Sequence, residues 1–594
     1  RTSTTFPLHR NTVLEDPLPR FINMFLVMML VVVSTSFSGC ATDEVQELAD
    51  VVLTNGKVVT VDDALPEAQA IAIRGDRIIA VGTNEEITAL VGELTSTIDL
   101  AGRLALPGFI EGHGHYTSLG RSKTILDLTQ VESWDEIVAM VADVVQSASP
   151  DQWIEGRGWH QEKWNEVPPG SVEGVPTHTT LSAVSNNNPV VLGHASGHAA
   201  FANAYALELA GINNQTPDPP GGTIVRDADG SATGLLRENA DGLVYRVVEK
   251  EKAQLSEAEK WNEFSHQVEL AGEEALSKGV TTFHDAGASF ATIDGFKQLA
   301  DEGRLPVRLY VMVRSESNVS MDDALPSYRM IGYGGNHLTV RSIKRQIDGA
   351  LGSHGAWLLE PYEDMPSSTG LWVEEPDDIE TTAQLAAKHG FQLNTHAIGD
   401  RANREVLDIY ERTFPEGAGG QMRWRIEHAQ HVHPDDVRRF ADLGVIASMQ
   451  GVHATSDAPW VYARLGVKRA ESGAYLWRSL IEAGVMVTNG TDTPVEDVSP
   501  ISSLYSSVVR QDRDGNEFFP GQRMTRLEAL QSYTINNAYA AFEEDIKGSI
   551  TVGKLADITV LDRDIMTVPE AEIARAQVDM TIVGGEIRFE RGSR

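Results

Sequence analysis

Short apolar runs alternate with helical patterns along most of the chain. Eight runs with the character of β-strands are each followed by a plausible helix. They lie at 104–110, 280–284, 307–313, 340–347, 392–396, 424–428, 445–450 and 485–492. Such alternation is typical of parallel βα units, and eight such units close a barrel. The pattern therefore predicts an α/β fold in which residues 107–546 form a (β/α)8 TIM barrel.

The stretch between the first and second predicted strands is longer than one βα unit requires. Residues from about 116 to 267 do not fit the barrel count and contain two β-like pieces of their own, at 153–159 and 190–198. We interpret this stretch as an inserted subdomain that helps to shape the pocket of the barrel.

Both ends of the chain are rich in short β-like runs. Runs at 49–61, 70–81 and 580–589 are interrupted by Asn55-Gly56, Gly75-Asp76 and Gly584-Gly585, pairs that favour two-residue hairpin turns. A further run lies at 556–561. We expect residues 49–106 and 547–592 to form one small composite β-sandwich, into which the barrel is inserted.

The first 40 residues have a different character. The apolar run 24–33 is too short for a comfortable membrane span but suits a secretory signal, and it leads to Phe37-Ser38-Gly39-Cys40. This tetrapeptide resembles a bacterial lipobox, with Phe37 in place of the usual Leu. The resemblance implies an upstream segment and a lipoprotein-type signal peptide at 1–40, lipidation of Cys40, and a periplasmic or membrane-anchored location in the bacterial cell envelope. The alternative is a buried N-terminal helix with an incidental cysteine.

Composition and charge narrow the classes of partner. Hydrophobic residues are 41% and charged residues 23% of the chain, which is ordinary for a globular protein. The 49 Lys and Arg against 85 Asp and Glu give a net charge of −36, which repels nucleic acid and anionic lipid headgroups. We therefore expect no nucleic-acid partner, and contact with a membrane only through a lipid anchor. The single cysteine excludes an intrachain disulfide and a cysteine-rich metal site.

Histidine, lysine and aspartate side chains stand at the ends of the predicted barrel strands, where TIM barrels carry their chemistry. Each of these residue types is unremarkable alone, but together they mark five strand ends. They are His113, His115, Lys344, His396, His428 and Asp492. Residues i and i+2 on a strand share a face, so His113 and His115 can address one ion. Imidazole and carboxylate ligands suit zinc-type metals.

Several longer motifs accompany these residues. They are LPGFI at 106–110 followed by EGHGH at 111–115, DGALGSHGA at 348–356, THAIGD at 395–400, RIEHAQ at 425–430, NGTDTPV at 489–495 and GSITVGKLAD at 548–557. Together they resemble the amidohydrolase superfamily, in the branch called amidohydrolase family 3, or YtcJ-like metal-dependent hydrolases. The resemblance covers nearly all of 49–590. The chain departs from the family pattern where Glu111-Gly112 replaces Asp-Ser and where Thr491 replaces Ser.

The resemblance implies one or two divalent metals per chain, with zinc expected. His113, His115 and Asp492 would hold the more buried metal, and His396 and His428 the second. Lys344 matches the family's lysine that can react with CO₂ to give a bridging carbamate. A water activated by the metal would attack a carbonyl group, and Asp492 would take the water's proton and pass it to the leaving nitrogen.

A second group of residues is expected to face the substrate. The inserted subdomain supplies Trp159, His194, His198 and Asn203, and the strand ends supply Asp285, Gln450 and His453. Ordinary packing of a lid is the competing interpretation for the first set.

The sequence thus predicts a hydrolase that cleaves a carbon–nitrogen bond other than a peptide bond, in an amide, N-formyl or cyclic amide of low molecular weight. A deaminase that acts on a heterocycle with a single metal is the first alternative. The second is a solute-binding lipoprotein that has lost catalysis. A homodimer is the default expectation for the oligomeric state.

Overall fold

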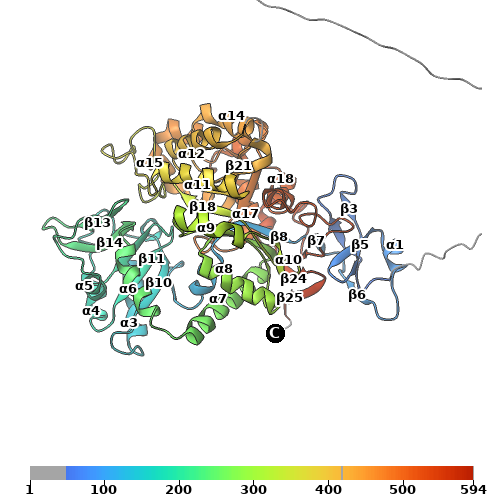
Figure 1. Cartoon of the computed structure of the whole chain (residues 1–594), viewed down its shortest axis with the longest axis horizontal. Helices are drawn as coiled ribbons and strands as arrows, with labels where there is room; N and C mark the ends of the chain where they lie inside the picture. Colours follow the sequence, from blue (N-terminus) through green and yellow to red (C-terminus); the bar gives the residue numbers. More distant parts are fainter. Residues whose placement is uncertain (1–47, 416–418, 593–594) are drawn as a thin grey trace, which may run out of the picture. The chain divides into compact units, whose positions relative to one another are not determined.

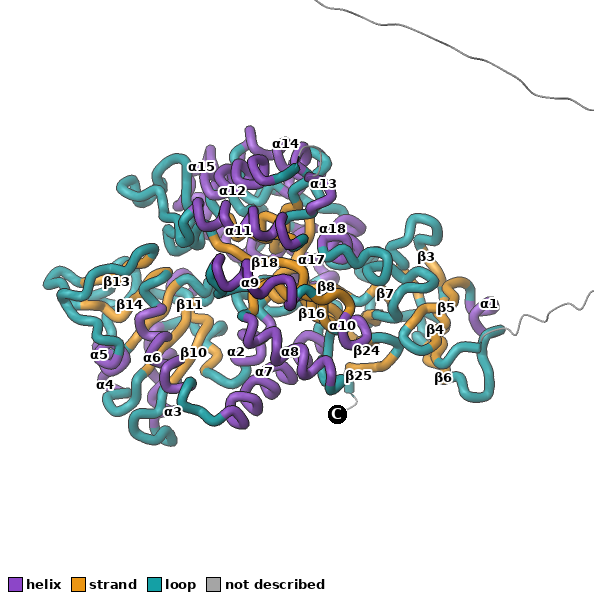
Figure 2. Tube along the Cα trace, in the orientation of Figure 1, coloured by secondary structure: helices purple, strands orange, loops and turns teal. Residues whose placement is uncertain are grey.

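The computed structural model of the protein describes residues 48–415 and 419–592 (Figures 1 and 2). The predicted signal peptide and its Cys40 lie outside these residues. Among the helices of the described residues, none is both long and apolar enough to cross a membrane.

A sheet of parallel strands forms the centre of the molecule and closes into the predicted barrel. In spatial order the strands are β22 (Val487–Gly490), β21 (Ile446–Gln450), β20 (Arg425–His428), β19 (Gln392–Ala397), β18 (Leu338–Gln346), β16 (Arg308–Val313), β15 (Val280–Ala288) and β8 (Phe109–Gly114). The last strand meets the first through two hydrogen bonds of 2.7 Å, from Asp492 N to His113 O and from His115 N to Thr493 O. A short strand, β17 (Met330–Gly332), pairs antiparallel with β18.

Helices alternate with these strands along the chain (Figure 2). They are α2 (Tyr116–Ser122), α7 (Glu257–Ser277), α8 (Phe290–Asp301), α9 (Asn318–Tyr328), α10 (Tyr333–Asn336), α11 (Pro376–His389), α12 (Asp400–Thr413), α13 (Gly419–Met422), α14 (Pro434–Leu443), α15 (Gly451–Gly473), α16 (Trp477–Glu482), α17 (Pro500–Val509), α18 (Arg526–Ser532) and α19 (Ile535–Ala540). Helix α12 shows why they pack: it buries Ala402, Val406, Ile409 and Tyr410, an apolar stripe at helical spacing.

The run 104–110, predicted as one barrel strand, is divided between two sheets. Its first part is β7 (Leu104–Pro107), which pairs with β23 (Ile558–Leu561), and only β8 from Phe109 onward belongs to the barrel. The chain changes sheets at Gly108, where a Cβ atom would lie 2.3 Å from Thr281 Oγ1. Pro107 has no N–H to offer a ladder and ends the first strand.

One terminal sheet combines both ends of the chain. It contains β25 (Glu586–Glu590), β24 (Val578–Val583), β23, β7, β2 (Lys57–Val59) and β3 (Glu67–Ala68) in that order. A four-stranded sheet of β5 (Arg77–Gly82), β4 (Ala70–Arg74), β1 (Val51–Thr54) and β6 (Ser96–Asp99) comes from the N-terminal part alone. The helices α1 (Asn84–Thr88) and α20 (Glu570–Ile573) accompany these strands. The composite character thus belongs to the six-stranded sheet.

The three predicted hairpin turns have different outcomes. Gly75-Asp76 joins β4 to β5, and Gly584-Gly585 joins β24 to β25, as predicted. The prediction for Asn55-Gly56 was wrong, because β1 and β2 belong to different sheets. A type I′ turn needs positive φ at both central residues. Gly584 and Gly585 satisfy this with φ of 57° and 82°. Gly75 alone of its pair has positive φ, at 55°, which a type II′ turn allows. Asn55 is also alone in its pair, at 55°, so the sheets to which β1 and β2 belong, and not φ, separate it from the two hairpins.

The residues between β8 and β15 form a second sheet. Its order is β13 (Gly222–Arg226), β14 (Ala232–Glu238), β12 (Ala199–Ala202), β11 (Val190–His194), β10 (Ile154–Trp159) and β9 (Leu126–Asp127). The helices α3 (Trp134–Val145), α4 (Thr179–Val184), α5 (Ala204–Leu209) and α6 (Gly242–Lys252) belong to the same stretch. Both β-like pieces predicted there are strands, β10 and β11, and they pair in parallel.

Candidate functional site

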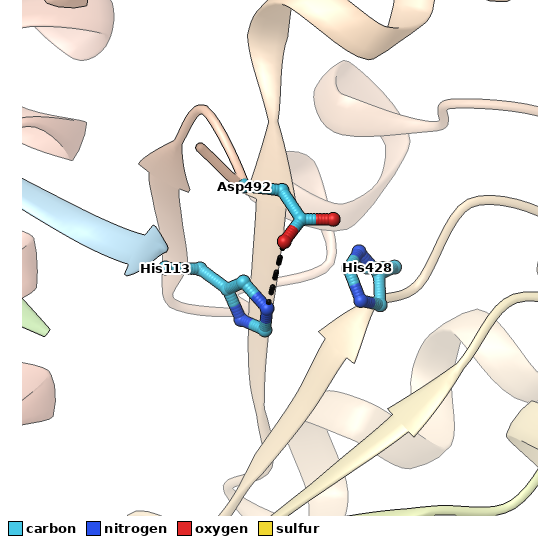
Figure 3. A group of neighbouring side chains, drawn as sticks. All are labelled: His113, His428 and Asp492. Atoms are coloured by element: carbon cyan, nitrogen blue, oxygen red, sulfur yellow. Dashed lines mark ion pairs between the residues drawn. The ribbon is translucent and has the colours of Figure 1, made fainter. Parts of the chain in front are cut away.

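Three side chains meet where barrel strands end (Figure 3). His113 stands on β8, His428 ends β20 and Asp492 follows β22. One ligand atom from each lies within 4.8 Å of the others, and all three residues are buried. His113 Nε2 is 3.5 Å from Asp492 Oδ1. The arrangement places two imidazoles and one carboxylate around a common point.

Left-handed backbone conformations aim two of these side chains. His428 has φ of 78° and Asp492 has φ of 56°, a region that costs L-residues free energy. On a regular strand, Glu427 and His428 would face opposite sides. The left-handed backbone at His428 allows both neighbours to reach His113: Glu427 contacts its Nδ1, and the His428 ring lies 4.7 Å from its ring.

The other three predicted ligands lie beside this cluster. His115 Nε2 is 3.2 Å from Asp492 Oδ1, and Lys344 Nζ is 3.4 Å from His113 Nε2. The His396 ring is 4.4 Å from the His428 ring, centroid to centroid. The structure thus brings all six predicted residues together.

The residues present fit a divalent cation. Burial lowers the pKa of His115 to about 4 and the pKa of His428 well below its usual value, so these imidazoles are neutral, which is the form that binds metals. His396 Nε2 is buried and makes no hydrogen bond to any described residue. Neutral nitrogen donors beside a carboxylate are the donor set that zinc-type metals prefer.

Lys344 is buried at the cluster, where the carboxylates of Glu427 and Asp492 favour its charged form but burial opposes it. Burial, followed by the charge of Arg314, lowers the pKa of Lys344 to about 8. The lowered pKa favours the neutral amine, which is the nucleophilic form.

Polar partners orient the metal-binding candidates. Glu427 Oε2 is 2.5 Å from His113 Nδ1, and Gln450 Oε1 is 2.8 Å from His428 Nδ1. Burial alone would raise the pKa of Glu427, but His113, with the charges of Arg425 and Lys344, lowers it to about 2. Each carbonyl or carboxylate oxygen accepts the proton on Nδ1 and leaves Nε2 free for a ligand bond. Gln450, predicted to face the substrate, instead positions His428.

Sequence reasoning missed Glu427 and Asp348, although both stand inside motifs that it quoted. The Asp348 carboxylate accepts hydrogen bonds from the backbone N–H groups of Ile398, Gly399 and Trp357, at 2.8 to 3.0 Å. Asp348 therefore fixes the loop that follows His396. An acidic residue beside a strand-end histidine was the available signal for Glu427.

A pocket lies beside the cluster of metal-binding candidates. His396, His428 and Asp492 line it, together with residues of the inserted sheet and of α15. Of the predicted substrate-facing residues, His194, His198 and His453 are on this lining. His198 Nδ1 is 2.7 Å from Glu238 Oε2, which orients the ring towards the pocket that it lines.

Three predicted substrate residues lie elsewhere. Asn203 caps α5, and its side chain bonds to backbone groups of the inserted sheet and to Ser185, so its role is structural. Trp159 is buried behind His194, with its Nε1 donating to Leu192 O at 2.8 Å. Asp285 is buried and accepts from Tyr116 N at 3.2 Å. Polar side chains near a strand end need not reach the pocket.

Comparison with known proteins agrees with this geometry. The model of the amidohydrolase family matches residues 96–589. Protein LONG AFTER FAR-RED 3 of Arabidopsis thaliana is 34% identical over 552 residues, which is 91% of each chain. N-substituted formamide deformylase of Arthrobacter pascens is 28% identical over 550 residues, 92% of this chain and 99% of its own.

A solved structure extends the likeness to the fold. An uncharacterized metal-dependent hydrolase from Pyrococcus horikoshii has a TM-score of 0.69 to this chain at 27% identity, and the match covers 88% of this chain and 99% of that one. Sequence family, barrel fold and a buried His–His–Asp cluster point to the same conclusion. The chain belongs to the amidohydrolase family, as a metal-dependent hydrolase.

Proposed function

We propose that the protein hydrolyses a carbon–nitrogen bond other than a peptide bond, in an amide, an N-formyl compound or a cyclic amide. The observation that carries the proposal is the convergence of His113, His428 and Asp492, whose ligand atoms lie within 4.8 Å of one another, with His428 and Asp492 on the lining of a pocket. The whole-length likeness to a protein called N-substituted formamide deformylase supports the N-formyl class.

The side chains of the cluster have two roles, which are metal binding and proton transfer. His113, His115, His396, His428 and Asp492 would hold the cation. Such a cation, when bound, supplies Lewis-acid activation of water and of the substrate's carbonyl oxygen.

Asp492 is the group placed to move a proton. Burial alone would raise its pKa, but the hydrogen bond from His115 holds the pKa of Asp492 well below its usual value. Its carboxylate is therefore ionised before the reaction and accepts the proton of the attacking water. It then delivers that proton to the leaving nitrogen, as base and then acid.

We also propose that Lys344 reacts with CO₂, and that the resulting carbamate would supply an anionic ligand to the cations when they are bound. Two cations close together need an anionic bridge, which an unmodified lysine does not supply. The lowered pKa of its buried amine favours the nucleophilic form that the reaction with CO₂ requires.

The experiment is a substrate screen on metal-loaded protein. Purified chain is incubated with N-substituted formamides, N-acyl amines and cyclic amides, and release of amine and carboxylate is followed by chromatography, with metal content measured on the same sample. Asp492→Asn is the control for contaminating activity. Turnover by wild type alone supports the proposal. Ammonia release from heterocycles with one metal per chain would favour the deaminase instead, and tight solute binding without turnover would favour a binding protein.

Location and assembly rest on sequence alone. We propose that Cys40 is lipidated in a bacterial cell envelope and that the chain forms a homodimer. Radiolabelled palmitate that enters wild type and not Cys40→Ser would support the first proposal, and the mass in solution tests the second.

A further inference from the structure

One face of α15 forms part of the pocket wall. His453, Ser456, Asp457 and Trp460 all line the pocket beside the metal-binding candidates. His453 and Trp460 are seven residues apart, which is two helical turns, so they share a face and stand roughly 10 Å apart along the helix axis. On this face His453 lies beside His428, one of the metal-binding candidates, and Trp460 lies beside His160.

His453 presents an unused N–H group near the cluster. The residue is 6% exposed, and its ring lies nearly parallel to the His428 ring, at 6.4 Å and 15°. Its Nδ1 is 3.3 Å from Gln430 Nε2. An amide nitrogen only donates, so Nδ1 accepts and the ring proton is on Nε2. That Nε2 is buried without a hydrogen-bond partner within 48–415 and 419–592.

Trp460 presents a second unused N–H group. The residue is 8% exposed, and its indole stacks on the His160 ring at 4.8 Å and 27°, which fixes its plane. Its Nε1 is buried, and no described residue accepts its hydrogen bond. Indole nitrogen is a donor only.

Two unpaired donors on one pocket wall are costly unless a ligand uses them. A buried polar group without a partner is unfavourable, because it has lost its hydrogen bonds to water and gained none in return. An acceptor atom on a substrate would remove that cost at each donor. A substrate that lacks the acceptor would be rejected, because it would leave the donor unpaired.

We propose that α15 recognises the substrate at two points: His453 Nε2 donates to the oxygen of the reacting carbonyl, and Trp460 Nε1 donates to a second acceptor far from the scissile bond. The inference rests on the proposed function and narrows its substrate class. The substrate is an elongated N-acyl compound with a hydrogen-bond acceptor roughly two helical turns from the bond that is cleaved. His453 is then a catalytic residue, because the hydrogen bond from its Nε2 becomes stronger as negative charge develops on the carbonyl oxygen in the transition state.

The test uses two N-formyl substrates of equal length, one ending in a carboxamide and the other in an isopropyl group of similar shape. His453→Phe keeps a ring and removes the donor, and should lower kcat about 100-fold on both substrates. His453→Gln restores an amide N–H and should recover part of the loss. Trp460→Phe should lower kcat/KM about tenfold for the carboxamide and less than twofold for the isopropyl compound.

The matched control is Trp424→Phe. Trp424 is also buried with an Nε1 that has no described partner, but it does not line the pocket. This variant should keep wild-type values for both substrates, with unchanged metal content and circular dichroism. If Trp460 serves packing alone, Trp460→Phe would lower kcat/KM equally for both substrates, and that result would overturn the assignment of its donor.

Binding separates this inference from the proposed function. Calorimetry with metal-loaded Asp492→Asn should show tighter binding of the carboxamide compound, and the added Trp460→Phe change should abolish the difference. If wild type cleaves neither compound but this binding preference holds, the proposed function fails and the Trp460 donor stands. If wild type cleaves both compounds and the His453→Phe and Trp460→Phe variants behave as wild type, the inference is overturned.

Discussion

Glu427→Gln tests whether the buried carboxylate tunes the metal site through His113. Glu427 is fully buried, and its Oε2 lies 2.5 Å from His113 Nδ1. The opposite oxygen, Oε1, makes no hydrogen bond to any described residue, so a glutamine can place its carbonyl on His113 without displacing a partner. The oxygen that accepts from His113 is kept, the negative charge is lost, and an amide NH2 takes the place of Oε1.

The magnitude follows from that difference. A hydrogen bond to a charged group contributes about 1.5–3 kcal/mol and a neutral one about 0.5–1.5 kcal/mol, so about 1–1.5 kcal/mol is lost. Because 1.4 kcal/mol is a factor of ten, metal affinity should fall about tenfold. Glu427→Leu also leaves the His113 Nδ1–H unpaired, which costs about 1–3 kcal/mol more. Its affinity should fall about 100-fold or beyond.

The assay is competition with a chromophoric chelator at pH 7.5, after the metal has been removed and the apoprotein shown to be folded. Glu257→Gln is the control, because the same change is made on a side chain that is 92% exposed. The reasoning would be refuted if both Glu427 variants bound metal as tightly as wild type. Equal losses for Gln and Leu would show that the acceptor's charge, and not its presence, decides affinity.

Three further predictions concern catalysis, metal count and stability. Asp492→Asn should lower kcat by about 10²–10⁴-fold with the fold intact, as steady-state kinetics and circular dichroism would show; a smaller loss would assign the proton transfer elsewhere. Lys344→Ala should reduce two metals per chain to one or none by mass spectrometry, and one metal in both proteins would make Lys344 a bystander. Burial raises the pKa of Asp457 to about 6, so its protonated form is favoured by folding. That stabilisation is complete below the unfolded pKa of about 3.9 and is lost as pH rises through 6. Between pH 4 and pH 7, the free energy of unfolding of the wild-type apoprotein should therefore fall by about 2 kcal/mol more than that of Asp457→Asn. Urea titrations at both pH values measure this difference. Equal falls in the two proteins would contradict the assignment.

Much of the fold could be predicted from the sequence, because the barrel repeats one pattern of apolar strand and helix. Strands buried in a parallel sheet are short apolar runs, and each of the seven runs from 280–284 to 485–492 overlaps an observed barrel strand. The metal-binding candidates were readable for the same reason, since the carboxyl ends of parallel strands meet at one edge of the barrel. His113, His428 and Asp492 are each marked by their place after an apolar run.

The errors share a physical cause. Pairing partners of a strand are chosen by contacts far away in sequence, so neither the separation of β1 from β2 nor the division of 104–110 between two sheets was visible locally. The wrong prediction for Asn203 has the same cause, because only the fold shows that its amide bonds to backbone groups of the inserted subdomain.

The sequence by itself determined the family, the barrel and the identity of the six residues that gather at the cluster, because these depend on local periodicity and on motifs. The tertiary structure alone decided which groups support them. Glu427 meets His113 across 314 positions, and Glu238 at the end of β14 meets His198, which directly precedes β12. The unpaired N–H groups of His453 and Trp460 likewise became visible only in the fold, since an unmet hydrogen bond is a property of everything that surrounds an atom.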